Sequence, residues 1–294
     1  MPAREANNIR WAITGMHKKD HPIIPASEMI SLAIKRHGDK LTLGWSGGRC
    51  STVVLHMALQ IDPDIKVVYG NTGIEFPENV EYVHEVADLW GVNLHELHPE
   101  TTFWKVVEEH GMPRFRRFGD DKSVKYLSRL GVSTDRRPYC CWLLKERPRY
   151  KFYKEHGTEG DITGMRAAES RARARTFNQR GILYELKSRP NIWVYHPIGL
   201  WSTEKMLDYF KENDLPHNPV YDTHDRNGCW ACTAYKGWEK TIMKYSPEMY
   251  KMLQRKRGVM LMDDYIPNHG PCEEDLQDSD QDPGLNTRHL ETNR

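Results

Sequence analysis

Two kinds of residue in this 294-residue chain could do chemistry: a glycine turn and two pairs of cysteines. The glycine turn covers residues 46–51 (Ser-Gly-Gly-Arg-Cys-Ser), between an apolar run of strand type and one of helix type. Glycines let a ligand approach the backbone, while amide N–H groups and the positive end of a helix dipole favour an anion. The turn therefore predicts a phosphate site, with a plain strand-to-helix turn as the alternative.

The cysteine pairs lie far apart in the sequence but suit one shared metal centre. The Cys-x-x-Cys spacing lets two thiolates meet at one centre, whereas adjacent cysteines strain the chelation of a single zinc ion. An iron–sulfur cube instead offers separate iron atoms to separate sulfurs. We therefore expect a 4Fe-4S cluster, with structural zinc or unmetallated thiols as alternatives. Its expected ligands are Cys140, Cys141, Cys229 and Cys232.

Composition limits the class of protein without identifying it. The chain has 42 basic and 41 acidic residues and a net charge of +1, so any basic surface must be local. No apolar stretch approaches the length of a membrane span, and the N-terminus has no apolar signal region. We expect a soluble cytoplasmic protein without a membrane contact, whose cysteines are ligands or reactive thiols and not disulfides.

The elements that must position these residues follow a β-α repeat. Strands are expected at 41–46, 65–70, 92–98, 161–163 and 193–198, and helices at 51–61, 78–90 and 203–213. This order predicts an α/β fold with a parallel sheet covered by helices, in which ligands bind at the carboxyl ends of the strands. The glycine turn follows the first strand and Asn71-Thr72-Gly73 follows the second.

The flanking segments complete the expected organisation. Residues 1–24 are mixed and polar and are expected to form an irregular arm, and a helix capped by Ser27 follows as far as Arg36. The tail has little apolar content and is expected to be disordered. The domains are then an arm and helix at 1–39, a nucleotide-binding domain at 40–235, a helical segment at 236–263 and a disordered tail at 264–294.

The glycine turn resembles the pyrophosphate loop Ser-Gly-Gly-x-Asp-Ser of the ATP pyrophosphatase (PP-loop) superfamily, in the branch that includes phosphoadenosine phosphosulfate (PAPS) reductase. Residues 71–78 resemble that branch's Asp-Thr-Gly-x-x-Phe-Pro-Glu segment, and residues 164–171 resemble its Gly-x-Arg-x-x-Glu-Ser segment. The resemblance implies a parallel-sheet, adenine nucleotide alpha hydrolase-like (HUP-type) domain with a helical, cysteine-bearing C-terminal part. The cysteine pattern resembles the cluster site of related reductases and sulfurtransferases.

The resemblance also implies roles for individual residues. Catalysis would involve Arg166, Glu169 and Ser51. The nucleotide would be bound by Ser46, Gly47, Gly48, Arg49, Ser51, Thr72, Gly73 and Arg166. Cys50 departs from the superfamily pattern, which has aspartate there, and a thiol is a poor ligand for the magnesium that accompanies ATP. Cys50 is then either a small packed residue or a sulfur-carrying thiol.

Basic residues crowd the region 112–180, where they suit either a phosphate-binding cleft or a solvated charged face. The two readings are balanced for 114–125, because Asp120 and Asp121 dilute the charge there. The arginines from 166 onward favour an anion site. By resemblance Arg171, Arg173 and Arg175 could reach a second, more distal phosphate.

Two function classes of this fold compete. In the favoured one, ATP adenylates a substrate oxygen, pyrophosphate leaves and sulfur displaces AMP. Its closest resemblance is to DNA phosphorothioation proteins, which implies ATP with Mg²⁺, DNA with accessory modification proteins and a cysteine desulfurase, and leaves room for a homo-oligomer.

In the second class, a reductase thiolate attacks the sulfur of adenosine phosphosulfate (APS) or PAPS. The reductases' Glu-Cys-Gly-Leu-His tail segment matches poorly around Cys272. A tRNA thiolation enzyme and a non-catalytic nucleotide sensor are the further alternatives.

Overall fold

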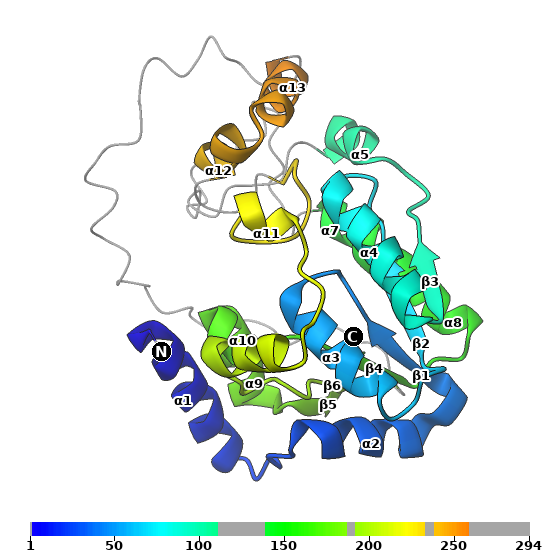
Figure 1. Cartoon of the computed structure of the whole chain (residues 1–294), viewed down its shortest axis with the longest axis vertical. Helices are drawn as coiled ribbons and strands as arrows, with labels where there is room; N and C mark the ends of the chain where they lie inside the picture. The colour runs from blue at the N-terminus through cyan, green and yellow to red at the C-terminus, as the bar shows by residue number, and fades with distance from the viewer. Residues whose placement is uncertain (1, 111–138, 187–191, 233–237, 259–294) are drawn as a thin grey trace, which may run out of the picture.

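The protein is built around one six-stranded sheet, as seen in a computed structural model that describes residues 2–110, 139–186, 192–232 and 238–258 (Figure 1). The strand order is β3-β2-β1-β4-β6-β5. The strands are β1 (Leu41–Gly44), β2 (Lys66–Gly70), β3 (Leu94–Leu97), β4 (Gly160–Thr163), β5 (Leu183–Glu185) and β6 (Trp193–Tyr195). All neighbours pair in parallel except β5 and β6, which are antiparallel. The predicted parallel sheet is confirmed, and the antiparallel edge strand β5 is an addition to it.

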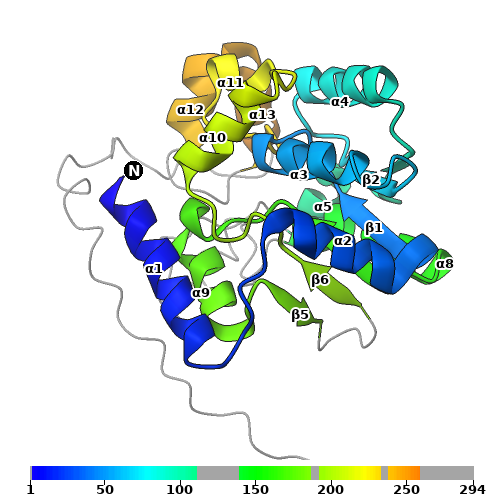
Figure 2. The ribbon, with the colours of Figure 1, turned by 60° about the horizontal axis from the view of Figure 1, so that its bottom comes forward.

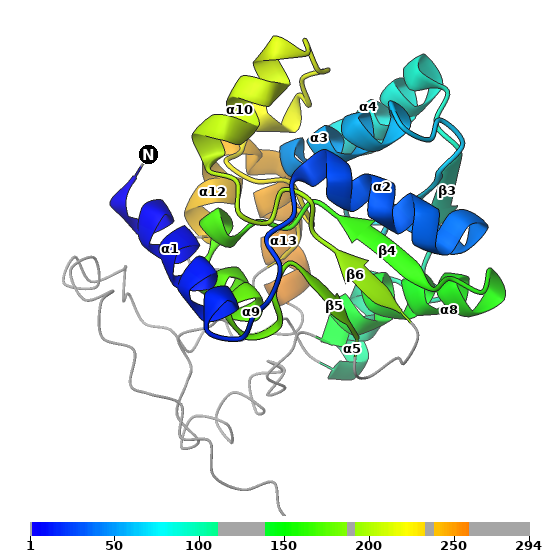
Figure 3. The ribbon, with the colours of Figure 1, turned by 90° about the horizontal axis from the view of Figure 1, so that it is seen from below.

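Helices cover both faces of the sheet. They are α1 (Ala3–His17), α2 (Ala26–His37), α3 (Arg49–Leu59), α4 (Pro77–Trp90), α5 (Phe103–His110), α7 (Tyr139–Cys141), α8 (Arg147–Glu155), α9 (Arg171–Arg180), α10 (Thr203–Glu212), α11 (Val220–Thr223), α12 (Trp238–Tyr245) and α13 (Pro247–Gly258). Helices α2, α3 and α4 lie on one face and α8 on the other (Figure 3).

Alternation along the strands explains this sandwich. In β2, Val67 and Tyr69 join the core beneath α2, α3 and α4, whereas Val68 joins Phe152 and Tyr153 of α8 on the opposite face. Successive side chains of a strand point to opposite sides, so a strand covered on both faces is apolar throughout. The carboxyl ends of β1, β2 and β4 are thereby fixed side by side at one edge of the sheet.

The predicted irregular arm at 1–24 is wrong, because residues 3–17 form helix α1. Its buried side includes Ala12 and Met16, which pack in the same core as Ala174 and Phe177 of α9. The polar composition of the segment hid this helical spacing. The predicted cap is wrong as well: α2 begins at Ala26, after Pro25, and Ser27 makes no capping hydrogen bond.

The remaining expected elements are found close to their predicted bounds. The helix expected at 203–213 is α10, whose first turn is capped by Ser202, since its Oγ accepts a hydrogen bond from the Lys205 N–H at 3.0 Å. The expected disordered tail at 264–294 and the basic segment 114–125 lie outside the described residues. Within the described part of the chain, every helix is too short or too polar to span a membrane.

Candidate functional site

The glycine turn joins β1 to the start of α3, and its geometry requires one glycine within the turn and another on the segment that packs against it. Gly47 has a φ of +72°, and a Cβ atom there would lie 2.3 Å from Asn79 Oδ1, so both conformation and space exclude a side chain. Gly164 follows β4, where a Cβ atom would lie 2.6 Å from the Ser51 backbone nitrogen. The end of β4 therefore packs directly on the first turn of α3.

Three asparagines hold the carbonyl groups of the loop from behind. Asn218 Nδ2 donates to the Gly47 carbonyl at 2.9 Å, and Asn227 Nδ2 donates to the Ser46 carbonyl at 2.8 Å. Both amides also donate to Asn79 Oδ1 at 2.7 Å. Asn79 and Asn218 are almost fully buried. Because buried hydrogen bonds fix the loop on its inner side, its geometry is set before any ligand binds.

Hydroxyl groups occupy the cleft side of the loop. Ser51 Oγ donates to the Gly48 carbonyl at 2.9 Å, and the Gly48 N–H donates to Ser46 Oγ at 3.4 Å. The Arg49 N–H donates to Tyr221 Oη at 3.4 Å, and the Arg49 guanidinium lies 4.0 Å from the centre of the Tyr221 ring. The N–H groups of Gly48 and Arg49 thus donate to hydroxyl oxygens, and phosphate oxygens could replace these hydroxyls as acceptors.

The loop opens into a cleft of about 910 Å³, within the range of sites for small ligands. The described residues that line it include six cations, which come from separate parts of the chain: Arg49, Lys145, Arg149, Arg166, Arg173 and Arg226. Three carboxylates line the same cleft: Glu75, Glu169 and Asp225. This excess of positive charge next to a helix N-terminus favours a polyanionic ligand.

Arg166 and Glu169, both predicted as site residues, meet around Cys50. The buried guanidinium of Arg166 donates through Nε to Cys50 Sγ at 3.1 Å and through Nη1 to the Trp201 carbonyl at 3.2 Å. Glu169 accepts from the Arg166 backbone N–H at 3.0 Å and pairs with Arg173. Cys50 Sγ lies 3.9 Å from Glu169 Oε1. One network thus joins the loop to the segment after β4.

Arg173 turns from α9 into this network. Burial lowers the pKa of Arg173, and the nearby charges of Arg166 and Arg226 lower it further, while Cys50 opposes them. Arg171 and Arg175, grouped with Arg173 by the sequence, are instead exposed on the outer side of α9. The cleft therefore holds one of these three arginines.

Thr72 and Gly73 lie away from the loop. Thr72 is buried, and its Oγ1 donates to Glu75 Oε1 at 2.9 Å and lies 3.8 Å from Cys229 Sγ. Neither Thr72 nor Gly73 is among the described residues that line the cleft, whereas Tyr69 and Gly70 at the end of β2 are. The motif after β2 is turned toward the cysteines.

The four cysteines predicted to share a centre are brought to one place. Cys140 and Cys229 pack against an apolar cluster that includes Phe103 and Trp230. The pKa of Cys140 is raised first by its hydrogen bond with Cys141, then by burial and by the charges of its cysteine neighbours, Cys141, Cys232 and Cys229. The same hydrogen bond lowers the pKa of Cys141 to about 7. Thiols from two distant segments therefore share one environment.

Lys145 and Glu75 stand between the cysteines and the cleft. Lys145 Nζ lies 3.2 Å from Glu75 Oε1 and also hydrogen-bonds Cys229, whose thiol donates to the same carboxylate oxygen at 3.7 Å. Burial raises the pKa of Cys229 to about 11, against the influence of Lys145. Because Lys145 and Glu75 also line the cleft, the cysteine group borders it directly.

The cysteine donor set fits an iron–sulfur cluster by its chemistry. Four soft thiols from two segments are the ligands such clusters use. In the described ranges, His, Cys, Asp and Glu side chains form no group of three or more that could hold a metal ion. The cluster is therefore a proposal that rests on the chemistry of the donor set alone.

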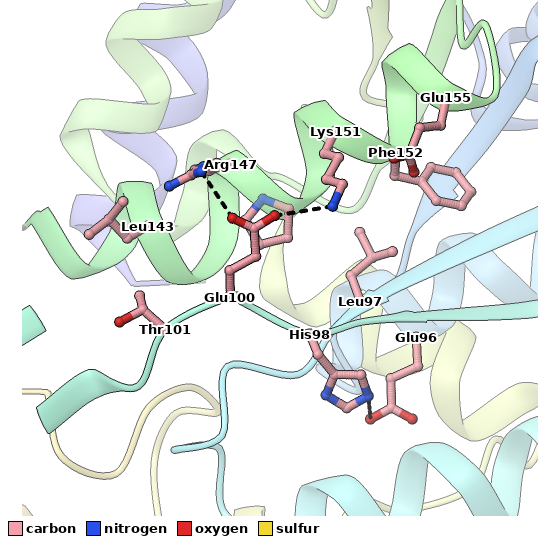
Figure 4. A pocket seen from close by; sticks show the side chains of 11 residues that line it. Glu96, Leu97, His98, Glu100, Thr101, Leu143, Arg147, Lys151, Phe152 and Glu155 are labelled. Atoms are coloured by element: carbon pink, nitrogen blue, oxygen red, sulfur yellow. Dashed lines mark hydrogen bonds and ion pairs between the residues drawn. The ribbon is translucent and has the colours of Figure 1, made fainter. Parts of the chain in front are cut away.

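A second, smaller pocket of about 190 Å³ lies beyond the end of β3 (Figure 4). Its central carboxylate, Glu100, is paired with Arg147 at 2.9 Å and with Lys151 at 3.1 Å. Because these charges neutralise one another on an exposed surface, this pocket offers no comparable field for an anion. The larger cleft is the better candidate site.

Comparison with known proteins supports the fold and decides the family. The sequence pattern of the phosphoadenosine phosphosulfate reductase domain matches residues 40–235. The chain belongs to this family. In structure it is similar to the phosphate complex of a PAPS reductase from Candida auris, with a TM-score of 0.52 and 20% identity over 72% of this chain and 91% of that one. The predicted PP-loop, HUP-type α/β fold is thereby confirmed.

Some relatives of similar sequence are named as reductases and others as uncharacterized proteins. An adenosine 5'-phosphosulfate reductase of Staphylococcus haemolyticus is 25% identical over 71% of this chain and 76% of its own length. An uncharacterized protein of Methanocaldococcus jannaschii is 27% identical over 88% of this chain, which spans 50% of that protein. Another uncharacterized protein of that organism is matched over 46% of its length. The chain thus covers only about half of some relatives.

Sequence reasoning missed the residues that support the loop. Asn218 precedes a proline and Asn227 precedes a glycine, so both look like ordinary turn residues, and Asn79 looks like part of an amphipathic helix. Lys145 could have been predicted as a neighbour of the cysteines, because it lies four residues after Cys141 and so on the same side of a helical turn. Nothing in the sequence around Tyr221 predicts its contact with the loop.

Proposed function

We propose that this chain is an ATP pyrophosphatase that activates an acceptor oxygen for the insertion of sulfur. The observation that carries the proposal is the glycine loop at the start of α3, which opens into a cleft with six cations. A triphosphate presents several negative charges in a row, and both the loop amides and the arginines suit them.

In the proposed first step, the acceptor oxygen attacks the α-phosphorus of ATP. The new O–P bond forms while the bond from the α-phosphorus to the bridging oxygen breaks, and pyrophosphate leaves with that electron pair. The backbone of Gly47 to Arg49 would hold the departing phosphates, with Ser46 and Ser51 beside them. Arg166 and Arg173 would neutralise the developing charge. Catalysis is then mainly positioning and charge neutralisation.

In the proposed second step, the outer sulfur of a persulfide donor attacks the activated acceptor phosphorus, and the P–S bond forms as the bond to AMP breaks, so AMP carries the acceptor's oxygen away. A second thiol then cleaves the S–S bond, which leaves the phosphorothioate and a disulfide. We propose a DNA phosphate as the acceptor, which makes the product a DNA phosphorothioate. This finer assignment comes from the resemblance of the cysteine pattern to the cluster site of phosphorothioation proteins. It implies accessory modification proteins and a cysteine desulfurase as partners.

Glu169 is better suited to orient arginines than to hold magnesium. Its carboxylate already accepts from the Arg166 backbone and pairs with Arg173. Cys50 supplies a soft thiol where a hard oxygen ligand would be needed. We therefore propose that Mg²⁺ enters as part of the ATP substrate, bound mainly by its phosphates.

Cys140, Cys141, Cys229 and Cys232 would hold a 4Fe-4S cluster, which when bound supplies thiolate-ligated irons at the edge of the cleft. Lys145 and Glu75 separate that position from the nucleotide. The residues of the chain then have two tasks here: Lys145 balances thiolate charge, and Glu75 fixes Lys145 and Thr72.

An APS or PAPS reductase is the second candidate. It is favoured by the names of relatives such as those of S. haemolyticus and Alteromonas mediterranea, the latter 26% identical over 67% of this chain and 70% of that protein. The same cleft would then bind an adenylyl sulfate, and a thiolate would attack its sulfur.

The two candidates are separated by their products. Anaerobically purified protein is incubated either with ATP, duplex DNA and a persulfide donor, or with APS or PAPS and a dithiol reductant. Pyrophosphate, AMP and sulfite are assayed, with iron measured on the same sample. The proposal predicts AMP and pyrophosphate in equal amounts from ATP. Sulfite from APS or PAPS without pyrophosphate from ATP would instead establish the reductase.

A further inference from the structure

The outer side of helices α1 and α9 carries exposed cations from two distant parts of the chain. We call this surface the basic face. Its members are Arg4, Arg10 and Lys18 on α1 and its cap, and Arg171 and Arg175, one turn apart on α9. In a chain with a net charge of +1, such a concentration is local, as the composition required.

The two helices form one fixed surface because they lie side by side (Figures 2 and 3). Asn178 Nδ2 donates to the Trp11 carbonyl at 2.8 Å, and Lys19 Nζ donates to the Gln179 carbonyl at 3.3 Å. A Cβ atom at Gly15 would lie 2.0 Å from Asn178 Nδ2, so glycine permits this close approach. The cations of both helices therefore keep their relative positions.

The positive charge of the basic face is not balanced within the two helices, both of which the structure describes in full. The one acidic residue of α1 is Glu5, which is buried and accepts from the Thr203 N–H at the start of α10. Helix α9 has no acidic residue. The nearest acidic residues along the sequence are Asp20, in the turn after α1, and Glu169, just before α9, which pairs with Arg173 on the cleft side.

The opposite side of the molecule carries the opposite charge. Helix α4 exposes four carboxylates, namely Glu78, Glu81, Glu85 and Asp88. It lies across the sheet from α1 in all three views (Figures 1, 2 and 3). A polyanion approaching the molecule is therefore attracted to the basic face and repelled by α4.

The basic face is continuous with the candidate cleft. Ser170 and Arg173 line the cleft at the start of α9, and Arg171 follows directly on the outer side, with its guanidinium 5.9 Å from the centre of the Trp11 ring. A row of phosphates lying along the face would thus reach the mouth of the cleft.

We propose that the basic face binds the phosphate backbone of duplex DNA and directs one phosphate into the cleft. The choice of DNA rests on the proposed function, whereas the binding of a polyanion rests on the charges alone. At 1.5 Å per residue, the 15 residues of α1 span about 22 Å. That length matches roughly six base pairs of duplex at 3.4 Å each.

The test is the salt dependence of DNA binding. A labelled duplex of about 20 base pairs is titrated with the full chain at several salt concentrations. The face variant carries Arg4→Gln, Arg10→Gln and Lys18→Gln, none of which touches the cleft. The matched control removes the same charge elsewhere with Lys35→Gln, Lys154→Gln and Lys211→Gln, all exposed residues on other helices.

The slope of log K against log salt is negative, and each lost phosphate contact reduces its magnitude by about 0.9. The magnitude should therefore be about 2.7 smaller in the face variant than in the wild type if all three cations contact phosphates. The control variant should keep the slope of the wild type. Equal slopes in the wild type and face variant, or an equal loss in the control, would overturn the proposal. Tighter binding of a duplex RNA of the same sequence would overturn DNA as the occupant.

Failure of this proposal can be told apart from failure of the proposed function. The dissociation constant of α,β-methylene ATP, measured without DNA, should be unchanged in the face variant. If the wild type binds DNA through the basic face but releases no pyrophosphate, the basic face stands and the ATP pyrophosphatase does not. If the wild type releases pyrophosphate but does not bind DNA through the basic face, the proposal for the basic face fails and the ATP pyrophosphatase stands.

Discussion

The two halves of the site are held in different ways. The loop half is fixed by hydrogen bonds from the side chains of Asn218 and Asn227, which share the buried acceptor Asn79. The cysteine half consists of thiols among apolar side chains, with Lys145 as a charged neighbour. The difference indicates that the loop is ready for an anion without a cofactor, whereas the cysteine half, in our proposal, is completed by one.

One short segment serves both halves. Asn218, Tyr221 and Asn227 contact the glycine loop, and Cys229 and Cys232 follow within a few residues. The segment between α10 and α12 therefore links the two halves covalently. The predictions below ask how far one half can be changed without the other.

The largest effect is expected for Arg166→Ala. Loss of the guanidinium removes a positive charge next to the loop, so pyrophosphate release from ATP should fall about 100-fold or more. The free energy of unfolding should fall by only about 1–3 kcal/mol, from the lost hydrogen bonds to Cys50 and Trp201. Turnover and urea unfolding are the two measurements.

Arg147→Ala is the matched control, since Arg147 is exposed and pairs with Glu100 outside the cleft. Arg147→Ala should change neither the rate of pyrophosphate release nor the free energy of unfolding by much. Unchanged turnover in Arg166→Ala would remove Arg166 from the site.

Cys140→Ala should separate the two halves. We expect anaerobically purified variant to lose its iron, because one of four proposed ligands is gone, while its ATP dissociation constant stays within about threefold of the wild type. Iron analysis and equilibrium binding measure this. Cys50→Ala is the control that should keep the iron. Retained iron in Cys140→Ala would exclude Cys140 as a ligand, and lost ATP binding would show that the loop depends on the cysteine half.

Asn79→Ala should weaken ATP binding and leave the iron content unchanged, the opposite of Cys140→Ala. Its removal leaves the amides of Asn218 and Asn227 without their shared acceptor, so the loop loses part of its support. We expect ATP affinity to fall about tenfold, equivalent to about 1.4 kcal/mol, with iron content unchanged. Asn71→Ala is the control, because Asn71 bonds Glu96 away from the loop. Equal losses of affinity in both variants would contradict the role of Asn79.

His196, buried after β6 beside Phe177 of α9, tests the core next to the cleft through acid stability. Burial and then the charges of Arg149 and Arg173 lower the pKa of His196 to about 3. Below pH 6.5 the unfolded chain therefore binds a proton that the folded one refuses, so stability is lost as the pH falls toward 3.

Between pH 7 and 5.5 the wild type should lose about 1 kcal/mol more stability than His196→Gln, measured by urea unfolding. Equal losses would mean that His196 is protonated in the folded protein.

The fold and the loop could be predicted because they depend on local patterns. Alternating apolar strands, helical spacing and a glycine turn after a strand are all visible in the sequence. Helix α1 was missed because several of its buried positions, such as Ala12 and Gly15, are small and because polar residues interrupt its apolar ones.

The support of the loop could not be predicted, since Asn79, Asn218 and Asn227 meet only after the chain has folded. The arginines of α9 were only partly predictable as cleft residues from the sequence. Residues two apart on a helix point in different directions, so Arg171 and Arg173 could not both enter one cleft.

The most direct test of the account is a crystal structure with the non-hydrolysable analogue α,β-methylene ATP and Mg²⁺. The account predicts that the β- and γ-phosphates lie on the backbone amides of Gly48 and Arg49, replacing the Ser46 and Tyr221 oxygens, with Arg166 and Arg173 beside them. Phosphates bound elsewhere, or a cleft that admits no nucleotide under saturating conditions, would contradict it.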